Sequence, residues 1–285
     1  MSAEPSQRPR LRVLTANVLG PANAAWQDRL PVLTRGLQQA APDIAALQEV
    51  PARDLGVVTA LLGGGYHLTP FSHAADDGIG GVLATRWPHQ VLAEIDQRDQ
   101  DRPGELPWAA TLLVRVATPV GDVVVAHHKP SWPFPAEAAR ERQALAAARA
   151  LEEHVGGAHA VLLGDLDATP DAASVLFLRG RRPIDGFSVC YQDAWETVHP
   201  REPGFTFDAV NPLVRRGEVA TAVSRRIDYV LVRSVAHGPT LQVVSCERLF
   251  TDPEDGVWAS DHFGVLAELA VPDHPPGSWG EADGR

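Results

Sequence analysis

Residues 161–171 read VLLGDLDATPD, an apolar run followed by closely spaced acidic residues. The three apolar residues at 161–163 predict a short buried strand. Asp165 and Asp167 follow at alternate positions, so in an extended backbone their side chains point to the same side. Gly164 allows the backbone either to turn here or to approach a ligand closely.

Two carboxylates at the carboxyl end of a buried strand suit a Mg²⁺ or Mn²⁺ site, or acid–base chemistry. The competing interpretation is an Asx-rich turn that caps a helix starting near Thr169, Pro170 and Asp171. The stretch by itself leaves both interpretations open.

Length and composition indicate a soluble globular protein with a sizeable core, since the 285 residues are 45% hydrophobic and 21% charged. No apolar run approaches the roughly 18 residues of a membrane span. The polar N-terminus carries no apolar leader, so we expect no secretory signal and a cytoplasmic location. Cys190 and Cys246 do not form a metal-like pair and are expected to be free thiols.

The chain is acidic, with a formal net charge of −11 and a pI of about 5.4. Such a balance disfavours tight, sequence-independent DNA binding, which depends on many Lys and Arg contacts to phosphates. It favours a small substrate, or one whose charge is met by a metal ion.

Polar residues also follow two predicted strands near the N-terminus. The strand predicted over 11–16 ends in Asn17, which is either a turn device or a polar group aimed at a ligand. The strand predicted over 44–47 is followed by Glu49, which would be costly to bury without a metal or a basic partner. The alternative is an exposed Glu49 that opens the next helix.

The C-terminal part adds an acid and an acid–histidine pair. Asp228 is embedded in the apolar stretch RIDYVLV at 226–232, and Asp261-His262 stands just before a final apolar strand. A buried Asp can fix the tautomer of a histidine and raise its basicity.

Adjacent histidines end another predicted strand, at 122–126. His127 and His128 must point to opposite sides of that strand, so at most one of them faces a given site. Apolar spacing predicts helices over 26–41 and 136–155, and a strand over 91–95 that pairs with the strand over 80–85.

Five separated segments stand in an order that resembles the endonuclease/exonuclease/phosphatase superfamily: TANVLG, LQEV, GDLDATPD, RIDYVLV and SDHFGVLAEL. This superfamily contains deoxyribonuclease I, abasic-site endonucleases, neutral sphingomyelinases and inositol polyphosphate 5-phosphatases. The resemblance runs from about Leu11 to Val271, and GVLATRWP at 81–88 is similar to a further family segment.

The resemblance implies one α/β catalytic domain over 11–271. Its fold would be a four-layer α-β-β-α sandwich, in which two mostly antiparallel sheets pack face to face and carry helices on their outer faces. We expect a disordered N-terminus over 1–10, a disordered tail over 272–285, and a monomer.

The resemblance also assigns a metal site. Glu49 matches the principal ligand of Mg²⁺, or of Mn²⁺ in its place. Asp261 matches a second acid at the metal, acting directly or through water. Asn17 matches the Asn that positions the metal-bound phosphate or the aspartate loop, and it counts among the expected metal ligands.

The catalytic group follows in the same way. His262 matches the catalytic histidine, Asp228 the acid that orients it, and Asp165 the acid that activates water or helps the leaving group. His128 lies where relatives place a His or Tyr that contacts the phosphate or the leaving oxygen, and His127 is the weaker choice by register.

One departure concerns Asp167, because the family pattern is Gly-Asp-Phe-Asn and this chain reads Gly-Asp-Leu-Asp. An Asn amide can donate to phosphate, whereas an ionised Asp cannot. Asp167 could instead bind metal, stay protonated through coupling to Asp165, or accept from a donor on the substrate.

Three functions are compatible with these residues. The first is a Mg²⁺-dependent phosphoesterase acting on a small or lipid-derived phosphate ester or diester. The second is a DNA endonuclease or exonuclease with the same site, for which four loop arginines could supply a local basic patch: Arg215, Arg216, Arg225 and Arg226. The third is an inactive binding module, which the retained acids and His262 argue against.

Overall fold

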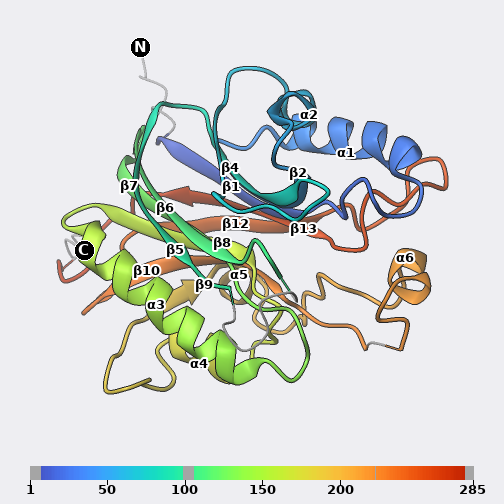
Figure 1. Ribbon diagram of the computed structural model, residues 1–285. Helices are drawn as coiled ribbons and strands as arrows, with labels where there is room; N and C mark the ends of the chain where they lie inside the picture. Colours follow the sequence, from blue (N-terminus) through green and yellow to red (C-terminus); the bar gives the residue numbers. More distant parts are fainter. Residues whose placement is uncertain (1–7, 99–105, 222, 280–285) are drawn as a thin grey trace, which may run out of the picture.

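Two β-sheets packed face to face form the centre of the protein, and helices cover their outer faces (Figure 1). The computed structural model describes residues 8–98, 106–221 and 223–279. The expected four-layer sandwich of mostly antiparallel sheets is therefore confirmed. Of the two ends expected to be disordered, residues 1–7 and 280–285 lie outside the described ranges, and the expected disorder stays a prediction.

The first sheet has six strands in the order β12-β13-β1-β2-β4-β3. Only β1 and β2 are parallel, and the other neighbours are antiparallel. The strands are β1 (Arg10–Asn17), β2 (Ile44–Pro51), β3 (His67–Pro70), β4 (Ile79–Thr85), β12 (Gln242–Leu249) and β13 (Gly264–Ala270).

The second sheet has the strand order β11-β10-β8-β7-β6-β5, and a short strand β9 also pairs with β10. Here β7 and β8 are the parallel pair. The strands are β5 (His89–Asp96), β6 (Ala110–Thr118), β7 (Gly121–Lys129), β8 (His159–Asp165), β9 (Tyr191–Asp193), β10 (Asp228–Val235) and β11 (Gly238–Pro239).

The helices form the outer layers. Helices α1 (Trp26–Ala40) and α2 (Leu55–Leu62) cover the first sheet, and α3 (Glu137–Val155) and α4 (Ala173–Leu178) cover the second (Figure 1). Their apolar residues belong to the same core clusters as residues of those sheets. Two short helices, α5 (Ala194–Val198) and α6 (Pro212–Arg216), lie in the long connections before and after residue 200.

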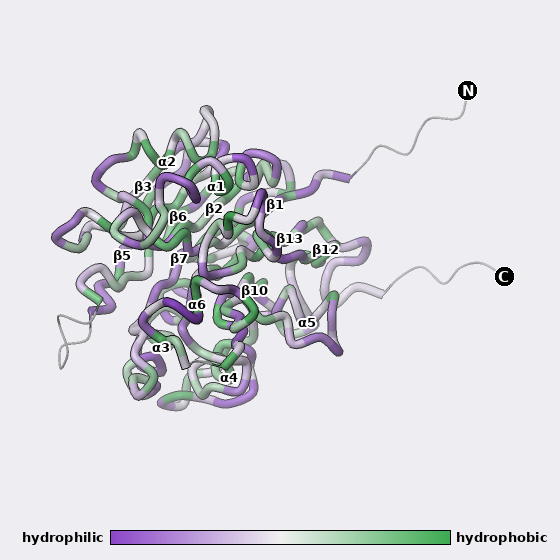
Figure 2. The backbone as a smooth tube through the Cα atoms, turned by 90° about the vertical axis from the view of Figure 1, so that its right-hand side faces the viewer, coloured by the Kyte–Doolittle hydropathy of each residue, from purple (hydrophilic) through white to green (hydrophobic). Residues whose placement is uncertain are grey.

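Alternating burial separates the faces of each strand. In β7, Val123 and Val125 belong to the core between the sheets, whereas Val124 and Ala126 pack under α3 and α4. This period of two is the expected behaviour of a strand buried on both faces. Figure 2 shows many hydrophobic stretches in the interior of the fold and many hydrophilic ones in the peripheral loops.

One strand pairing differs from the sequence-based prediction. The strand expected over 91–95 does not pair with β4. It is part of β5, which pairs with β6 in the other sheet. The reason is that both edges of β4 are already taken, by β2 and by β3.

Strand pairing places the chemistry at one edge of the sandwich. Asn17 and Gln48 lie opposite each other near the carboxyl ends of the parallel strands β1 and β2. In the second sheet, Asp228 starts β10 directly opposite Asp165, the last residue of β8. The polar strand ends predicted from the sequence therefore meet in space, although they are far apart in the chain.

Position 164 requires a glycine because a neighbouring strand, rather than a ligand, lies against its backbone. Its φ is +156°, and a Cβ atom placed on it would lie 2.0 Å from the carbonyl oxygen of His128 in β7. No side-chain rearrangement can relieve this overlap, because the oxygen belongs to the backbone.

We therefore expect Gly164→Ala to lower the free energy of unfolding by on the order of 2 kcal/mol or more, through overpacking and backbone strain. Urea denaturation monitored by circular dichroism measures the change. Gly157→Ala is the matched control, because a Cβ at Gly157 meets no atom within 4 Å. Equal stability of the two variants would contradict the close-packing explanation.

Candidate active site

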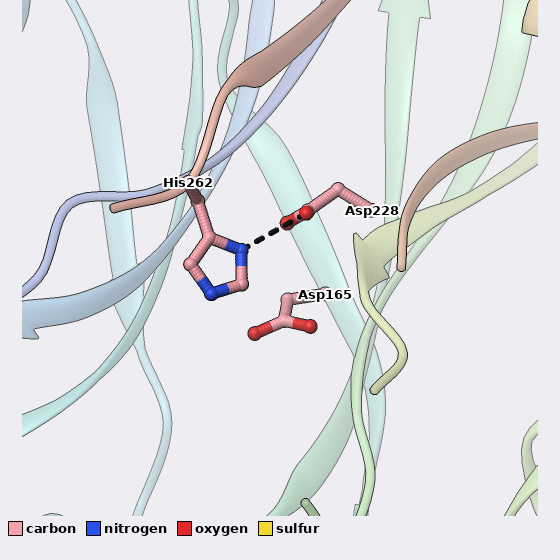
Figure 3. A group of neighbouring side chains, drawn as sticks. All are labelled: Asp165, Asp228 and His262. Atoms are coloured by element: carbon pink, nitrogen blue, oxygen red, sulfur yellow. Dashed lines mark hydrogen bonds and ion pairs between the residues drawn. The ribbon is translucent and has the colours of Figure 1, made fainter. Parts of the chain in front are cut away.

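Three buried side chains from separate segments of the chain converge at the sandwich edge: Asp165, Asp228 and His262 (Figure 3). Asp165 ends β8, Asp228 begins β10, and His262 lies two residues before β13. The Nδ1 atom of His262 is 3.0 Å from Oδ2 of Asp228, and one potential ligand atom from each residue lies within 4.8 Å of the others. The predicted His262–Asp228 pair is thus present as a hydrogen-bonded dyad.

Mutual electrostatics set the charge of this group. Burial disfavours the imidazolium of His262, but Asp228 and Asp165 outweigh it and raise the pKa of His262 well above its usual value. Burial also disfavours ionised Asp165, but Lys129 and His262 outweigh it and lower its pKa to about 2. Burial raises the pKa of Asp228, although His262 partly offsets the rise. The arrangement holds a protonated imidazole against an ionised Asp165.

Backbone contacts fix the dyad. The Thr206 hydroxyl accepts from the backbone N–H groups of Ile227 (3.0 Å) and Asp228 (3.1 Å). The ring of Phe207 meets that of His262 edge-on, with 5.1 Å between the centroids. On the other side, Ser260 Oγ accepts from the His262 N–H at 3.3 Å. These supports leave little freedom for the imidazole to rotate away from Asp228.

Lys129 is a site residue that the sequence interpretation missed. Its Nζ donates to Oδ2 of Asp165 at 2.6 Å and also to Asp167, and only 3% of its side chain is exposed. Burial works against the charge of this ammonium, but Asp165 and Asp167 outweigh it and raise the pKa of Lys129. A signal was present, since Lys129 stands two positions after His127 and therefore shares its face of β7.

Lys129 also accounts for Asp167, the departure from the family pattern. Asp167 has a φ of +50°, and its backbone N–H donates to Oδ1 of Asp165 at 3.2 Å. Burial and the neighbouring Asp165 raise the pKa of Asp167, which Lys129 partly offsets. In this structure the Asp167 carboxylate accepts from Lys129.

Of the two histidines of β7, His127 rather than the expected His128 lies on the face that points toward the first sheet. His127 lies on the inter-sheet face, where its ring packs on Phe71 and its Nε2 is 2.8 Å from Nε2 of Gln48. The structure does not bring His128 to the acidic group. Its Nδ1 is 2.7 Å from the Thr111 hydroxyl, on the side of β7 that faces α3 and α4. The alternation of β7 decides this, because Lys129 and His127 share the face that reaches Asp165.

A second acidic group lies beside the first, on the ends of β1 and β2. Glu49 sits where the pairing of β2 with β4 shifts register between Leu47 and Val50, and its φ is +57°. A non-glycine residue with positive φ at a strand bulge is a costly conformation that is common at functional sites. The bulge aims the Glu49 carboxylate at Asn17.

Asn17 joins the two acidic groups. Its Nδ2 donates to Oε1 of Glu49 at 2.8 Å and to Oδ2 of Asp165 at 3.1 Å. Its Oδ1 accepts from the backbone N–H of Leu19 at 3.0 Å. The amide nitrogen therefore faces the carboxylates, which is the orientation of a residue that positions them. The role of Asn17 as a metal ligand stays a prediction.

The electrostatics of Glu49 suit a cation. Burial, together with repulsion from Asp261, raises the pKa of Glu49 to about 7. Carboxylate oxygens are the ligands that hard divalent cations prefer. A cation bound by Glu49 and Asp261 would offset both the cost of burying the Glu49 charge and its repulsion from Asp261. The donor set therefore fits a divalent metal. The group of Asp165, Asp228 and His262 is also compact enough to hold an ion, but its histidine and acid are already paired with each other.

Arg29 supports this region from below and was not anticipated. It is 1% exposed, and its guanidinium donates to the backbone carbonyls of Val18 (2.9 Å), Leu19 (2.5 Å) and Ala259 (3.1 Å). It thereby ties the chain after β1 to the segment that carries Asp261. Burial lowers the pKa of Arg29, and Asp261 and Glu49 oppose that effect.

The fold and this arrangement of acids, histidine and lysine define a metal-dependent phosphoester hydrolase, of the nuclease or phosphodiesterase kind. The model of the Endonuclease/Exonuclease/phosphatase family matches residues 14–262, and the chain belongs to this family. A search of curated proteins found no match. The expected family, fold and enzyme class are confirmed.

Solved structures of the same fold include two TDP2 proteins. The chain aligns with Danio rerio TDP2 complexed with a single-strand DNA product at 21% identity and a TM-score of 0.69, covering 92% of this chain and 99% of that one. Truncated Caenorhabditis elegans TDP2 aligns at 18% identity and a TM-score of 0.70, covering 92% and 98%.

A bacterial family member is also similar. The endonuclease/exonuclease/phosphatase from Beutenbergia cavernae DSM 12333 aligns at 23% identity and a TM-score of 0.64, covering 95% of this chain and 74% of that one. At these identities the likeness concerns the fold. Among the described residues, no helix combines the length and apolarity needed to cross a membrane.

The buried Lys129 pairs generate a stability prediction. We expect Lys129→Met to destabilise the protein by about 3–5 kcal/mol at pH 7, because two buried carboxylates lose their cation. Adding Asp167→Asn should recover part of this loss, since one of the two uncompensated charges is then removed. Urea unfolding of the single and double variants measures the coupling.

The pH dependence of that penalty has a defined sign. The pKa of Asp165 is lowered from 3.8 to about 2 in the folded protein, so its ion pair stabilises above pH 3.8 and is lost as the pH falls toward 2. The penalty of Lys129→Met should therefore shrink over that range. A penalty that is the same at pH 7 and pH 3 would contradict the ion-pair assignment.

Proposed function

We propose that the protein hydrolyses a phosphate mono- or diester by in-line attack of water, with Mg²⁺ or Mn²⁺ as the metal. The observation that carries the proposal is the hydrogen-bonded His262–Asp228 dyad beside Asp165, next to the carboxyl groups of Glu49 and Asp261. The neighbouring acids raise the pKa of His262 and so favour its cationic form. A cationic donor and an anionic acceptor held close together can stabilise the charges that develop in the transition state of phosphoester hydrolysis.

The metal would be held by Glu49 and Asp261, with Asn17 orienting the Glu49 carboxylate or adding its amide oxygen. When bound, it would supply Lewis acidity toward the non-bridging oxygens of the phosphate. The bulge at Glu49 and the backbone contacts of Arg29 hold this half of the site in place before substrate arrives.

The protein's own groups divide the proton chemistry. His262, held through Nδ1 by Asp228, leaves Nε2 free to donate to a phosphate oxygen. Asp165 is ionised and would accept a hydrogen bond from the attacking water. Lys129 keeps Asp165 ionised and so acts as a positioning residue. His128 has no part in this proposal, because it lies on the helix side of β7.

A DNA nuclease with the same chemistry is the second candidate. In its favour, a protein of the same fold, Danio rerio TDP2, is described as complexed with a single-strand DNA product. Against it stands the net charge of −11, which gives no protein-wide attraction for a polyanion. Cleavage of plasmid or abasic DNA at low enzyme concentration would favour the nuclease over a small-ester hydrolase.

A monomeric, cytoplasmic enzyme remains our expectation.

We expect His262→Ala to lower kcat for bis-p-nitrophenyl phosphate by roughly 10²–10⁴-fold in the presence of Mg²⁺ or Mn²⁺, the usual contribution of a positioned proton donor. Release of p-nitrophenolate measures the rate, and removal of metal with a chelator should abolish it. His67→Ala is the control, because His67 is exposed on β3, away from the site. Undiminished turnover in His262→Ala would contradict the mechanism.

Metal binding should depend on pH through Glu49. With a pKa of about 7, Glu49 must lose a proton before it can ligate, so Mn²⁺ affinity should rise with pH up to about 7 and then level off. Removing the repulsion by Asp261→Asn should move this midpoint to lower pH while weakening the plateau affinity. Calorimetric titration with Mn²⁺ at a series of pH values tests both effects, and a flat pH profile would refute them.

A further inference from the structure

Arg225 lies one aromatic ring away from His262. Its Cζ is 5.5 Å from the centroid of the Phe207 ring, which meets the His262 ring edge-on at 5.1 Å. The ring of Phe134, from the segment after β7, lies 4.4 Å from the same Cζ. The guanidinium of Arg225 is therefore in cation–π contact with two phenylalanines at the rim of the site.

The polar edge of this guanidinium is unused by the protein. Within the described residues, the Arg225 side chain makes no hydrogen bond or ion pair, and its Nε is a buried donor without a partner. The buried arginines differ from half-buried Arg225, because their guanidinium groups have partners. Arg29 and Arg140 donate to backbone carbonyls, and Arg226, whose Nε is also unpartnered, pairs through Nη1 with Asp193 at 2.5 Å.

An arginine whose guanidinium is stacked on aromatic rings and makes no hydrogen bond can bind an oxyanion. Aromatic contacts involve the faces of the guanidinium, so the in-plane N–H donors remain for a ligand. These donors form a fork that matches phosphate or carboxylate bidentately. A buried charged donor that stays unpaired costs more than a neutral one, so an unpaired donor beside an active site calls for an explanation.

The position of Arg225 is set by the backbone. Phe207 and Arg225 exchange both backbone hydrogen bonds, at 2.9 and 2.8 Å, and Phe207 also forms a β-bridge with His262. Phe134 is held by its carbonyl, which accepts from Nη2 of Arg140 at 3.2 Å. The backbone of Arg225 is thus paired with Phe207, which in turn is paired with His262 of the dyad.

We propose that Arg225 binds a second oxyanion of the substrate, distinct from the phosphate that is hydrolysed. This inference rests on the proposed function and narrows it. The substrate class is a phosphoester that carries a further phosphate group a few bonds from the scissile one, as in a nucleotide unit or in a bisphosphorylated polyol. The two Phe rings hold the guanidinium in place before the ligand binds, which reduces the entropy lost on binding.

Direct binding tests the proposal, and His262→Ala is carried as a background substitution in every protein so that the phosphate-ester ligands are not turned over. Thymidine 3′,5′-bisphosphate and thymidine 5′-monophosphate differ by one phosphate, and calorimetry with the metal-loaded protein gives the ratio of their Kd values. We expect the bisphosphate to bind more tightly, and Arg225→Met to reduce that preference roughly tenfold or more, as for loss of a charged hydrogen bond. Propane-1,3-diol bisphosphate and propyl phosphate repeat the comparison without a nucleoside and separate the two sources of phosphate.

Two further variants keep the result interpretable. Arg225→Lys retains the charge but loses the planar fork, so its preference should fall between those of the protein that retains Arg225 and Arg225→Met. Arg86→Met is the matched control, since Arg86 also stacks on an aromatic ring, that of Tyr66 at 3.9 Å, at the end of β4 remote from Glu49. Thermal melting of each variant shows whether it is folded.

A preference for the bisphosphate that survives Arg225→Met unchanged would overturn the proposal, as would a protein that retains Arg225 but prefers neither ligand of a pair. Measuring hydrolysis as well distinguishes failure of the second-oxyanion site from failure of the proposed hydrolytic function. If bis-p-nitrophenyl phosphate is cleaved with His262 dependence but the bisphosphate preference is absent, the phosphoesterase stands and the second-oxyanion site fails. If the preference is present and depends on Arg225 but no ester is cleaved, the binding site stands and the hydrolytic function fails.

Discussion

Repulsion among carboxylates that share one buried edge is the constraint on which the rest of the structure depends. Asp165, Asp167 and Asp228 would destabilise the seam between the sheets if they were left uncompensated, because buried charges lose their hydration. Lys129 and His262 supply the opposite charge from within the protein. Glu49 and Asp261 are each partly exposed, and their mutual repulsion suits a divalent cation.

The two sheets divide this task between them. The second sheet contributes Lys129, Asp165 and Asp228 through β7, β8 and β10, whose pairing puts them at the same edge. The first sheet contributes Asn17 and Glu49, and Asn17 reaches across to hydrogen-bond both halves. A site built on paired strand ends is rigid, which is what preorganised electrostatics requires. The rim is built on the same principle, since backbone pairing between Phe207 and Arg225 sets their position relative to His262.

Local sequence patterns predicted the site residues that end apolar strands. They did not predict which face of a strand, or which strand edge, packs against a given neighbour. The strand ends at Asn17, Glu49 and Asp165 were visible because polar residues interrupt apolar runs. The face of β7 was not, because the alternation that puts His127 toward the first sheet could equally have put His128 there. The pairing of β5 with β6 was missed for a similar reason, since which strand edge is free depends on the whole sheet.

The sequence by itself determined the family, the layered α/β architecture, and the identity of the residues that carry the charge, because residue types at strand ends are written in the chain. Only the tertiary structure decided which of these residues meet. It showed that Lys129 neutralises Asp165 and Asp167, that Arg29 ties together the backbone beneath Glu49, and that Arg225 is held by two phenylalanines with its polar edge unused. The physical reason is that pairing of charges is a property of distance and burial, and both arise from contacts between residues far apart in the sequence.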